Sequence, residues 1–235
     1  METLGDLLDR QARGSEPAVR AHGPGATVEY DYHDLVTTAW KTANFFSLRG
    51  VHAGSTVGVV DDPAVPPVLA FLGAAQLGAA TRFDPPRDVD CELLVGPGET
   101  VLDYDLPPGA TRVAYTAGEN VDDPAVEAFG RSVWSENPVE PPEAVAPGAP
   151  ALWTPEGVLP HSDLLARAEA VAVDLAPGDA VAVRAPLALV GTVVAGVLAP
   201  LLARATIVFP GEDAVGDVAV ATGDAPEPRV VGVGG

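Results

Sequence analysis

Hydrophobic and polar positions in residues 27–60 change from strand-like to helical spacing and back. Residues 27–32 alternate as in a short strand, and residues 55–60 form an apolar run with the length of a buried strand. The positions between these two runs predict a helix that begins after Asp31, the expected cap, and ends at Gly50. Its apolar face comprises Leu35, Ala39, Ala43 and Phe46.

A second helix and a second copy of the same pattern follow. Residues 66–79 predict a helix rich in small residues, and residues 80–86 predict a short strand that Pro85 stops. Farther along, "LAPGDAVAVRAP" resembles the earlier "VHAGSTVGVVDDP", and each precedes an apolar helix and a short strand. The chain therefore contains two strand–helix–strand units. The matching positions are Gly54 with Gly178, Val57 with Val181, and Val59 with Val183.

Shorter elements are expected between and after these two units. Residues 91–96 and 111–118 predict strands, and residues 122–134 predict a helix with Asp123 at its cap and Pro124 at its first position. Two last short strands are expected at residues 217–222 and 229–233. The proline-rich residues 137–150 predict a linker. We therefore expect a first α/β subdomain at 1–136, this linker at 137–150 and a second α/β subdomain at 151–235.

The charge of the chain restricts its partners. The formal net charge is −20 and Lys41 is the single lysine, so nucleic acids and anionic membranes are unfavourable partners. An acidic, lysine-poor surface is typical of a cytoplasm at molar salt, where charges are strongly screened. We expect a halophilic archaeal source and a cytoplasmic location. An ordinary acidic protein from a high-GC organism is the alternative.

Two segments bear on compartment and membrane association. Cys91 is the single cysteine, so no internal disulfide can form, and a small buried hydrophobe is its expected role. The charged N-terminus has no apolar core that would indicate secretion. Residues 185–203 carry no charge and are long enough to span a bilayer, but Pro186 and Pro200 interrupt them. A buried helix of an α/β domain is the preferred interpretation, and a membrane span is the alternative.

Three apparent motifs predict no catalytic or metal site. Residues 93–103 contain two glycines of a dinucleotide fingerprint, but the third glycine is missing, so a plain turn is expected. His161, Ser162 and Asp163 are adjacent and cannot form a nucleophile–base–acid chain; we expect Ser162 or Asp163 to cap a helix, with His161 just outside it. The four histidines lack partners at metal-ligand spacing.

The order of these elements resembles that of AMP-forming adenylating enzymes, the superfamily of acyl-CoA synthetases and luciferases. The resemblance covers roughly residues 5–211 and implies a trimmed version of the family's large N-terminal domain, without the small C-terminal lid domain. The matching positions in the first half are Tyr32, Leu35, Gly50, Val51, Gly54, Val57, Gly78 and Pro85. Those in the second half are Gly157, Val158, His161, Leu164, Gly178, Asp179, Val181 and Pro186.

The segment "ALWTPEGVLPHSDLL" departs from the family at the phosphate-binding loop. The family has a Ser/Thr/Gly-rich loop and a lysine there, whereas only Pro155 and Glu156 separate Thr154 from Gly157 here. Two residues cannot surround a triphosphate, and a glutamate repels it. We therefore expect a tight connection. The resemblance makes Thr154, Gly157 and His161 vestigial phosphate-loop positions, and Pro186, Ala188 and Leu189 vestigial acyl-pocket positions.

These departures predict a non-catalytic relative of the acyl-CoA synthetases. We expect no catalytic residue, no metal and no bound cofactor, although the family uses ATP, Mg²⁺ and CoA. The expected partners are a full-length acyl-CoA synthetase, a second copy of the chain, or a weakly bound small acyl or nucleotide-like ligand. One alternative is a part of a split AMP-forming acid–thiol ligase that another chain completes.

Overall fold

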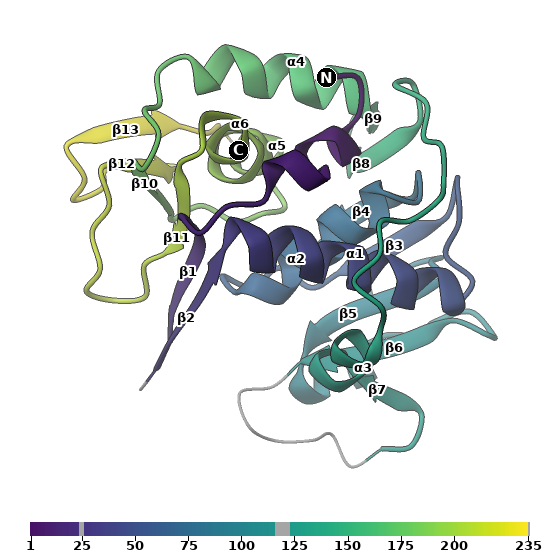
Figure 1. Cartoon of the computed structure of the whole chain (residues 1–235). Coiled ribbons are helices and arrows are strands. Elements are labelled where there is room, and N and C mark those ends of the chain that lie inside the picture. Colours follow the sequence, from purple (N-terminus) through teal and green to yellow (C-terminus); the bar gives the residue numbers. More distant parts are fainter. Residues whose placement is uncertain (24–25, 116–122, 235) are drawn as a thin grey trace.

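The strands that the hydrophobic pattern predicts assemble into two mostly parallel sheets with helices on their faces (Figure 1). The computed structural model describes residues 1–23, 26–115 and 123–234. Sheet A contains, in spatial order, β13 (Arg229–Gly232), β12 (Val218–Ala221), β10 (Ala180–Val183), β11 (Thr206–Phe209), β1 (Pro17–Gly23) and β2 (Ala26–Asp31). Sheet B contains β7 (Val126–Ala128), β6 (Thr111–Tyr115), β5 (Leu93–Pro97), β3 (Thr56–Val59), β4 (Ala80–Phe83), β8 (Pro150–Thr154) and β9 (Gly157–Pro160).

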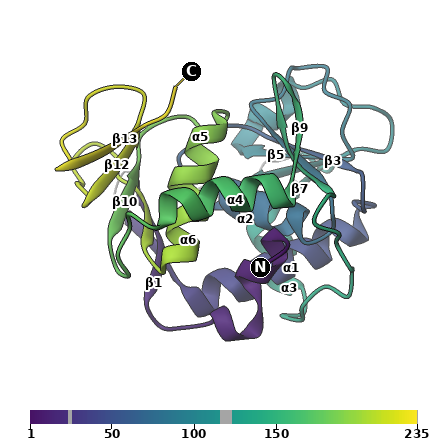
Figure 2. The ribbon, with the colours of Figure 1, turned by 90° about the horizontal axis from the view of Figure 1, so that it is seen from above.

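Helices lie between and around the two sheets. Figure 2 shows α2, α4 and α6 between sheet A on one side and sheet B on the other. The α-helices are α1 (Tyr32–Leu48), α2 (Val65–Ala75), α3 (Phe129–Ser135), α4 (His161–Ala172), α5 (Val190–Thr192) and α6 (Ala199–Ala203). The tighter 3₁₀ turns are η1 (Leu4–Leu8), η2 (Arg10–Ala12) and η3 (Gly98–Asp103), and η4 (Val193–Leu198) is π-helical. The expectation of an α/β fold with flanking helices is confirmed.

Both strand–helix–strand units have the expected order of elements, and the two strands of each unit pair in parallel. In the first unit, β3 pairs with β4, and Val57 lies opposite Thr81. In the second unit, β10 pairs with β11, and Val181 lies opposite Ile207. Gly54 and Gly178 begin the two units with φ angles of 88° and 86°, a conformation that favours glycine. The internal repeat inferred from the sequence is therefore a repeat of structure.

The first helix follows its local signals. The Asp31 carboxylate accepts a hydrogen bond from the Asp34 backbone N–H at 2.7 Å, as an N-cap does. Helix α1 ends at Leu48, and Gly50 follows with a φ of 87°. The buried face of α1 contains Leu35, Ala39, Ala43 and Phe46, together with Trp40 and Phe45.

The predicted helix over residues 122–134 is wrong in its first half. Val126–Ala128 form strand β7, which pairs in parallel with β6, and α3 begins only at Phe129. Asp123 does not cap a helix; its carboxylate accepts a hydrogen bond from the Ala125 N–H at 2.8 Å. Residue 122, and residues 116–118 of the strand predicted over 111–118, lie outside the described residues. Residues 126–128 gain backbone pairing with β6 at the edge of sheet B, and this pairing outweighed their local preference for a helix.

Two other local predictions also need correction. Helix α4 begins at His161 after Pro160, so neither Ser162 nor Asp163 is its cap, and His161 lies inside the helix. The antiparallel strand β9 runs up to Pro160 and sets this start. In place of a plain turn after β5, the chain forms the 3₁₀ helix η3.

The linker at residues 137–150 does not separate the two sheets. The β1–β2 hairpin comes from the first segment of the chain but extends sheet A, where β1 pairs with β11. The β8–β9 hairpin follows the linker but extends sheet B, where β8 pairs with β4. Each sheet is therefore completed by a hairpin from the other segment, and the sequence boundary is not a boundary between sheets.

Within the uncharged segment over residues 185–203, residues 190–203 form the helical run α5–η4–α6, which packs beside α4. Its residues from Val193 to Leu201 are buried within the protein. No helix in the described part of the chain has the length and apolar character that a bilayer crossing requires.

Candidate functional site

The segment at which the resemblance predicts a lost phosphate loop is a two-residue β-hairpin turn. Thr154 pairs with Gly157 across the β8–β9 ladder, so Pro155 and Glu156 alone form the connection. The Thr154 hydroxyl lies 2.9 Å from the Gly157 carbonyl oxygen and accepts a hydrogen bond from the Glu156 N–H at 3.2 Å. The polar groups of the turn therefore bond to one another. The tight connection expected from the sequence is present.

His161, the third position predicted to be a vestige of the phosphate loop, is part of the core. His161 is fully buried, and its Nδ1 accepts a hydrogen bond from the Leu4 backbone N–H at 3.1 Å. Burial lowers the pKa of His161 to about 4, against a smaller opposing effect of Asp6. The imidazole is therefore neutral at pH 7, with its proton on Nε2, which has no hydrogen-bond partner among the described residues. His161 anchors the N-terminal segment to α4.

The positions predicted as a vestigial acyl pocket lie in the loop between β10 and α5, where Pro186 is exposed and Ala188 and Leu189 are half-buried. Asp61, just after β3, accepts backbone hydrogen bonds from Leu187 at 3.1 Å and Ala188 at 2.8 Å. Burial raises the pKa of Asp61, although these two N–H groups oppose the shift. Asp61 thus ties this loop to the end of sheet B.

The structure does not bring the two vestigial sets together through hydrogen bonds. Within the described residues, Thr154 and Gly157 bond to their own turn, His161 bonds to Leu4, and the acyl-pocket loop bonds to Asp61. These assignments of vestigial roles remain predictions from the resemblance. Among the described residues, no cluster of three His, Cys, Asp or Glu side chains is placed to hold a metal ion.

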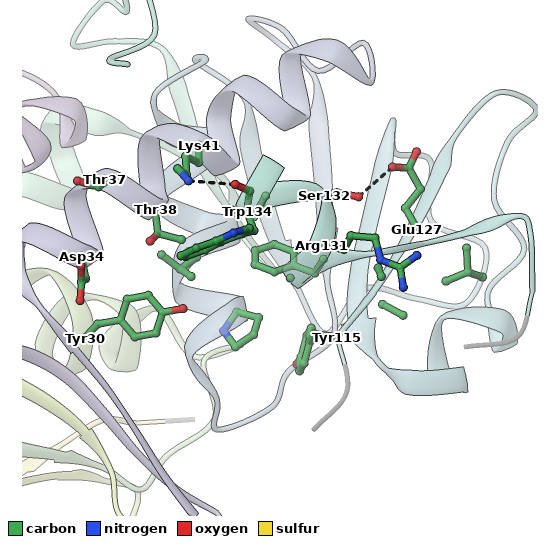
Figure 3. Close-up of a pocket in the computed structure, with 18 of the residues that line it drawn as sticks. Tyr30, Asp34, Thr37, Thr38, Lys41, Tyr115, Glu127, Arg131, Ser132 and Trp134 are labelled. Atoms are coloured by element: carbon green, nitrogen blue, oxygen red, sulfur yellow. Dashed lines mark hydrogen bonds between the residues drawn. The ribbon is translucent and has the colours of Figure 1, made fainter. Parts of the chain in front are cut away.

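A large hollow in the described part of the chain lies elsewhere, between β2, α1, β6 and α3. It has a volume of about 1420 Å³, and Figure 3 shows Tyr30, Lys41, Tyr115 and Trp134 around it. The Lys41 ammonium donates a hydrogen bond to the Trp134 carbonyl oxygen at 3.1 Å and lies 4.8 Å from the centroid of its indole ring. The single lysine of the chain therefore belongs to this cavity and not to the hairpin.

Two tyrosines of the cavity occupy low-dielectric environments. The Tyr115 hydroxyl donates a hydrogen bond to the Asp62 carboxylate at 3.0 Å, and burial together with this carboxylate raises the pKa of Tyr115. Burial, with a further contribution from Asp34, raises the pKa of Tyr30. Both tyrosines are therefore neutral hydrogen-bonding groups at physiological pH.

The single cysteine of the chain, Cys91, is a buried thiol. Cys91 is 3% exposed and packs in an apolar cluster with Val60 and with Leu94 of β5, as expected of a buried hydrophobe. Burial raises the pKa of its thiol to about 11, so almost no thiolate forms at pH 7.

Sequence reasoning missed both Asp61 and the cavity. The pair Asp61–Asp62 at the end of a predicted parallel strand was a usable signal, because side chains at such ends face the neighbouring elements. The cavity had no comparable signal. It joins residues that are far apart in the sequence, and part of its wall is the strand β7 that was predicted as a helix.

Comparison with known proteins finds similarity in structure and not in sequence. No protein-family model matches the chain, and no curated protein matches its sequence. The anthranilate CoA ligase AuaEII, solved in complex with anthranoyl-AMP, is similar with a TM-score of 0.73 at 17% identity. The N-terminal domain of FACL13 from Mycobacterium tuberculosis is similar with a TM-score of 0.70 at 18% identity.

The similarity covers nearly all of this chain but only part of those proteins. It includes 89% of this chain and 45% of AuaEII, and 91% of this chain and 58% of the FACL13 domain. The chain thus spans about half the length of the solved structures it matches. Its two mostly parallel sheets with flanking helices have the α/β fold of the matched parts of these two structures.

Proposed function

We propose that the chain is a non-catalytic relative of the AMP-forming acyl-CoA synthetases, which keeps their scaffold and has lost their ATP chemistry. The observation that carries this proposal is the two-residue hairpin between Thr154 and Gly157. A phosphate-binding loop presents several free backbone N–H groups and a cation. This turn presents the Glu156 carboxylate and has its Thr154 hydroxyl occupied by its own backbone.

Two further features support the loss of adenylation. The Lys41 ammonium is held by the Trp134 carbonyl on a different element from the hairpin. His161 at the family's loop-exit position is buried and bonded to Leu4. Losing a single donor that stabilises a transition state costs about 3–4 kcal/mol, or roughly 10²–10³ in rate. Several such groups are missing here, so adenylation by this chain alone should be undetectable.

The test is calorimetric titration with ATP, AMP and short acyl-CoAs at molar KCl, together with an ATP–pyrophosphate exchange assay. We expect no saturable ATP binding and no exchange. The variant Glu156→Lys restores a cation to the turn, and we expect it to remain unable to bind ATP because the backbone cradle is absent. Micromolar ATP binding by the natural chain would overturn the proposal, most directly if Glu156→Lys strengthened it.

A split ligase is the second candidate function. The chain matches only 45% of AuaEII, so a second polypeptide that supplied the remaining ligase motifs would complete an enzyme of that size. Mixing the chain with a full-length acyl-CoA synthetase, or with the product of a neighbouring reading frame, tests this idea. Exchange activity that requires both chains would establish the split enzyme, and a stable but inactive complex would support a partner-binding role.

The proposed setting is the cytoplasm of a halophilic archaeon, with self-association as the other form of partnership. The net charge of −20 supports this setting, because such a surface repels itself at low salt. Unfolding and sedimentation should therefore be measured between low salt and molar KCl. We expect stability to rise with KCl; stability that falls with KCl would remove the halophilic interpretation.

A further inference from the structure

The cavity between β2, α1, β6 and α3 is walled by aromatic rings from different elements. Tyr30 comes from β2, Tyr115 from β6, and Phe129 and Trp134 from α3. Figure 3 shows the Tyr30 side chain directed into the cavity, with its hydroxyl on the side of Trp134 and Tyr115. Trp134 is 81% exposed, although tryptophan is normally well buried. An exposed indole beside a concave aromatic wall is typical of a binding site.

The charges of the cavity favour a positively charged ligand. Carboxylates outnumber cations among the lining side chains: Glu29, Asp34, Asp123 and Glu127 against Lys41 and Arg131. Arg20 pairs with Glu29 at 2.5 Å, and Arg49 pairs with Glu127 with one contact at 2.8 Å. The Asp34 carboxylate has no such cationic partner among the described residues. Asp123, the remaining lining carboxylate, accepts a hydrogen bond from the Ala125 N–H. Asp34 therefore supplies negative charge at the Tyr30 end of the cavity.

Asp34 lies close enough to Tyr30 for its charge to act on the ring. Figure 3 places the Asp34 carboxylate beside the Tyr30 ring, and the carboxylate contributes to the raised pKa of Tyr30. The Tyr30 hydroxyl has no hydrogen-bond partner among the described residues. A carboxylate next to an aromatic face and a free hydroxyl is a suitable environment for an ammonium group, because the ring and the carboxylate both attract positive charge.

The other end of the cavity favours an apolar group. The lining of the cavity includes the apolar side chains of Pro66, Leu69 and Val133 as well as Trp134. Lys41 already lies against Trp134, so a second cation there would be repelled, whereas a neutral aromatic or aliphatic group would not. The two ends of the cavity thus differ in the chemistry they accept.

We propose that this cavity binds organic cations with an apolar body. The ammonium group lies between the Asp34 carboxylate and the Tyr30 ring, and the apolar body lies toward Trp134 and Val133. This site is separate from the β8–β9 hairpin, and its ligand binding does not depend on whether the chain has lost ATP chemistry.

Three probes of similar size and different charge test the proposal: benzyltrimethylammonium, benzyl alcohol and phenylacetate. Binding is measured from amide chemical-shift changes in two-dimensional NMR spectra of the full chain, at low salt and at molar KCl. We expect saturable shifts at the cavity residues and a preference for the cation over the alcohol of about tenfold at low salt, which is the size of a favourable cation–π contact. Phenylacetate should bind weakest.

Variants separate the two ends of the site. Asp34→Asn and Tyr30→Leu should reduce the cation-to-alcohol preference to about twofold, because they remove the attraction for positive charge. Trp134→Leu should weaken the cation and the alcohol to a similar extent. Trp153→Leu is the matched control, since Trp153 is also exposed and lies beside Arg82 but is outside the cavity.

Three results would overturn the proposal. Phenylacetate binding as tightly as the cation would make Lys41 the anchor for an anionic ligand. Trp153→Leu weakening the cation as much as Trp134→Leu would show non-specific adsorption to aromatic residues. Shifts that do not saturate at millimolar probe would show that the cavity holds no ligand of this class. ATP titration of the same variants distinguishes this site from the hairpin, because loss of cation binding should leave the ATP result unchanged.

Discussion

The two strand–helix–strand units share a backbone plan but are stabilised differently. Val60 follows β3 in the first unit and packs in an apolar cluster with Cys91 and Leu94. The matching residue of the second unit is Arg184, whose guanidinium contacts the Glu227 carboxylate at 2.6 Å. The Glu227 side chain is 0% exposed. One local plan thus tolerates an apolar contact or a buried ion pair at the same position, and the surroundings decide which is present.

The largest test of this difference is Glu227→Ala. Removing one partner of a buried ion pair leaves the other charge uncompensated, so we expect a loss of about 3–5 kcal/mol in the free energy of unfolding. Val60→Ala is the matched change in the first unit and should cost about 1–2 kcal/mol. Denaturant unfolding at molar KCl measures both. Equal losses would show that the ion pair has no special weight in the second unit.

The same ion pair predicts an acid dependence. Burial alone would raise the pKa of Glu227, but hydrogen bonds from Arg184 and the Gly216 N–H lower it overall. The native state therefore binds this proton less readily than the unfolded state, and the contribution is lost as pH falls through the lowered pKa. Glu227→Gln should flatten this part of the acid-unfolding curve.

The helices that cover the two units provide the second test. Helix α1 packs on α2 with an apolar face, whereas α4 packs on η4 and α6 and begins with the buried His161. The pKa of His161 is lowered to about 4. Between pH 6.5 and 4 the unfolded state takes up this proton and the native state does not. The free energy of unfolding therefore decreases by up to about 3 kcal/mol as the pH is lowered through this range.

His161→Gln removes this titration while keeping an acceptor for the Leu4 N–H. We expect the variant to lose less stability than the natural chain between pH 6.5 and 4, as measured by denaturant unfolding at several pH values. Identical slopes for the two proteins would place the acid sensitivity in other groups and contradict the assigned role of His161.

The third test concerns glycines in the two connecting helices. A Cβ on Gly73 in α2 would lie 2.8 Å from the Thr42 methyl and 3.2 Å from the Ala43 nitrogen of α1. A Cβ on Gly196 in η4 would meet the Val183 methyl at 3.0 Å. We expect Gly73→Ala to destabilise by about 2 kcal/mol, since α1 cannot move away, and Gly196→Ala by about 1 kcal/mol or less. Thermal unfolding measures both, and the reverse order would contradict the tighter packing of the first unit.

The smallest expected difference concerns the ends of these helices. Gly78 and Arg204 hold the left-handed conformation after α2 and α6, with φ angles of 68° and 59°. Gly78→Ala should cost about 1 kcal/mol from backbone strain alone. Arg204→Gly relieves similar strain but removes an ion pair with Glu16 at 3.0 Å and a cation–π contact with Tyr32 at 3.6 Å. We expect a net loss of about 1 kcal/mol, and a gain would show that the strain outweighs these contacts.

The local elements with strong signals were predictable from the sequence. Asp31 and Gly50 bound α1 because a cap and a left-handed glycine act within a few residues of chain. The tight connection between Thr154 and Gly157 followed from chain length, since two residues leave no room for a loop. The helix over residues 122–134 was wrong because pairing of β7 with β6 depends on a neighbour in space.

The candidate sites were less predictable than the elements. His161 was expected just outside a helix, and its hydrogen-bond partner Leu4 is 157 residues away in the sequence. The cavity depends on Tyr30 and Trp134 being brought together by the packing of α3 beside α1. No periodicity in the sequence encodes such a contact, because each segment meets its local requirements without the other.

The sequence by itself determined the two parallel strand–helix–strand units, their glycine-bounded turns and the short connection between Thr154 and Gly157. Only the tertiary structure decided that β1–β2 joins sheet A and β8–β9 joins sheet B, and that an aromatic cavity forms beside α3. The physical reason is the distance along the chain over which each effect acts. Backbone conformation and hydrophobic periodicity act over a few residues, whereas strand exchange and cavity formation depend on burial shared by segments that are distant in the chain.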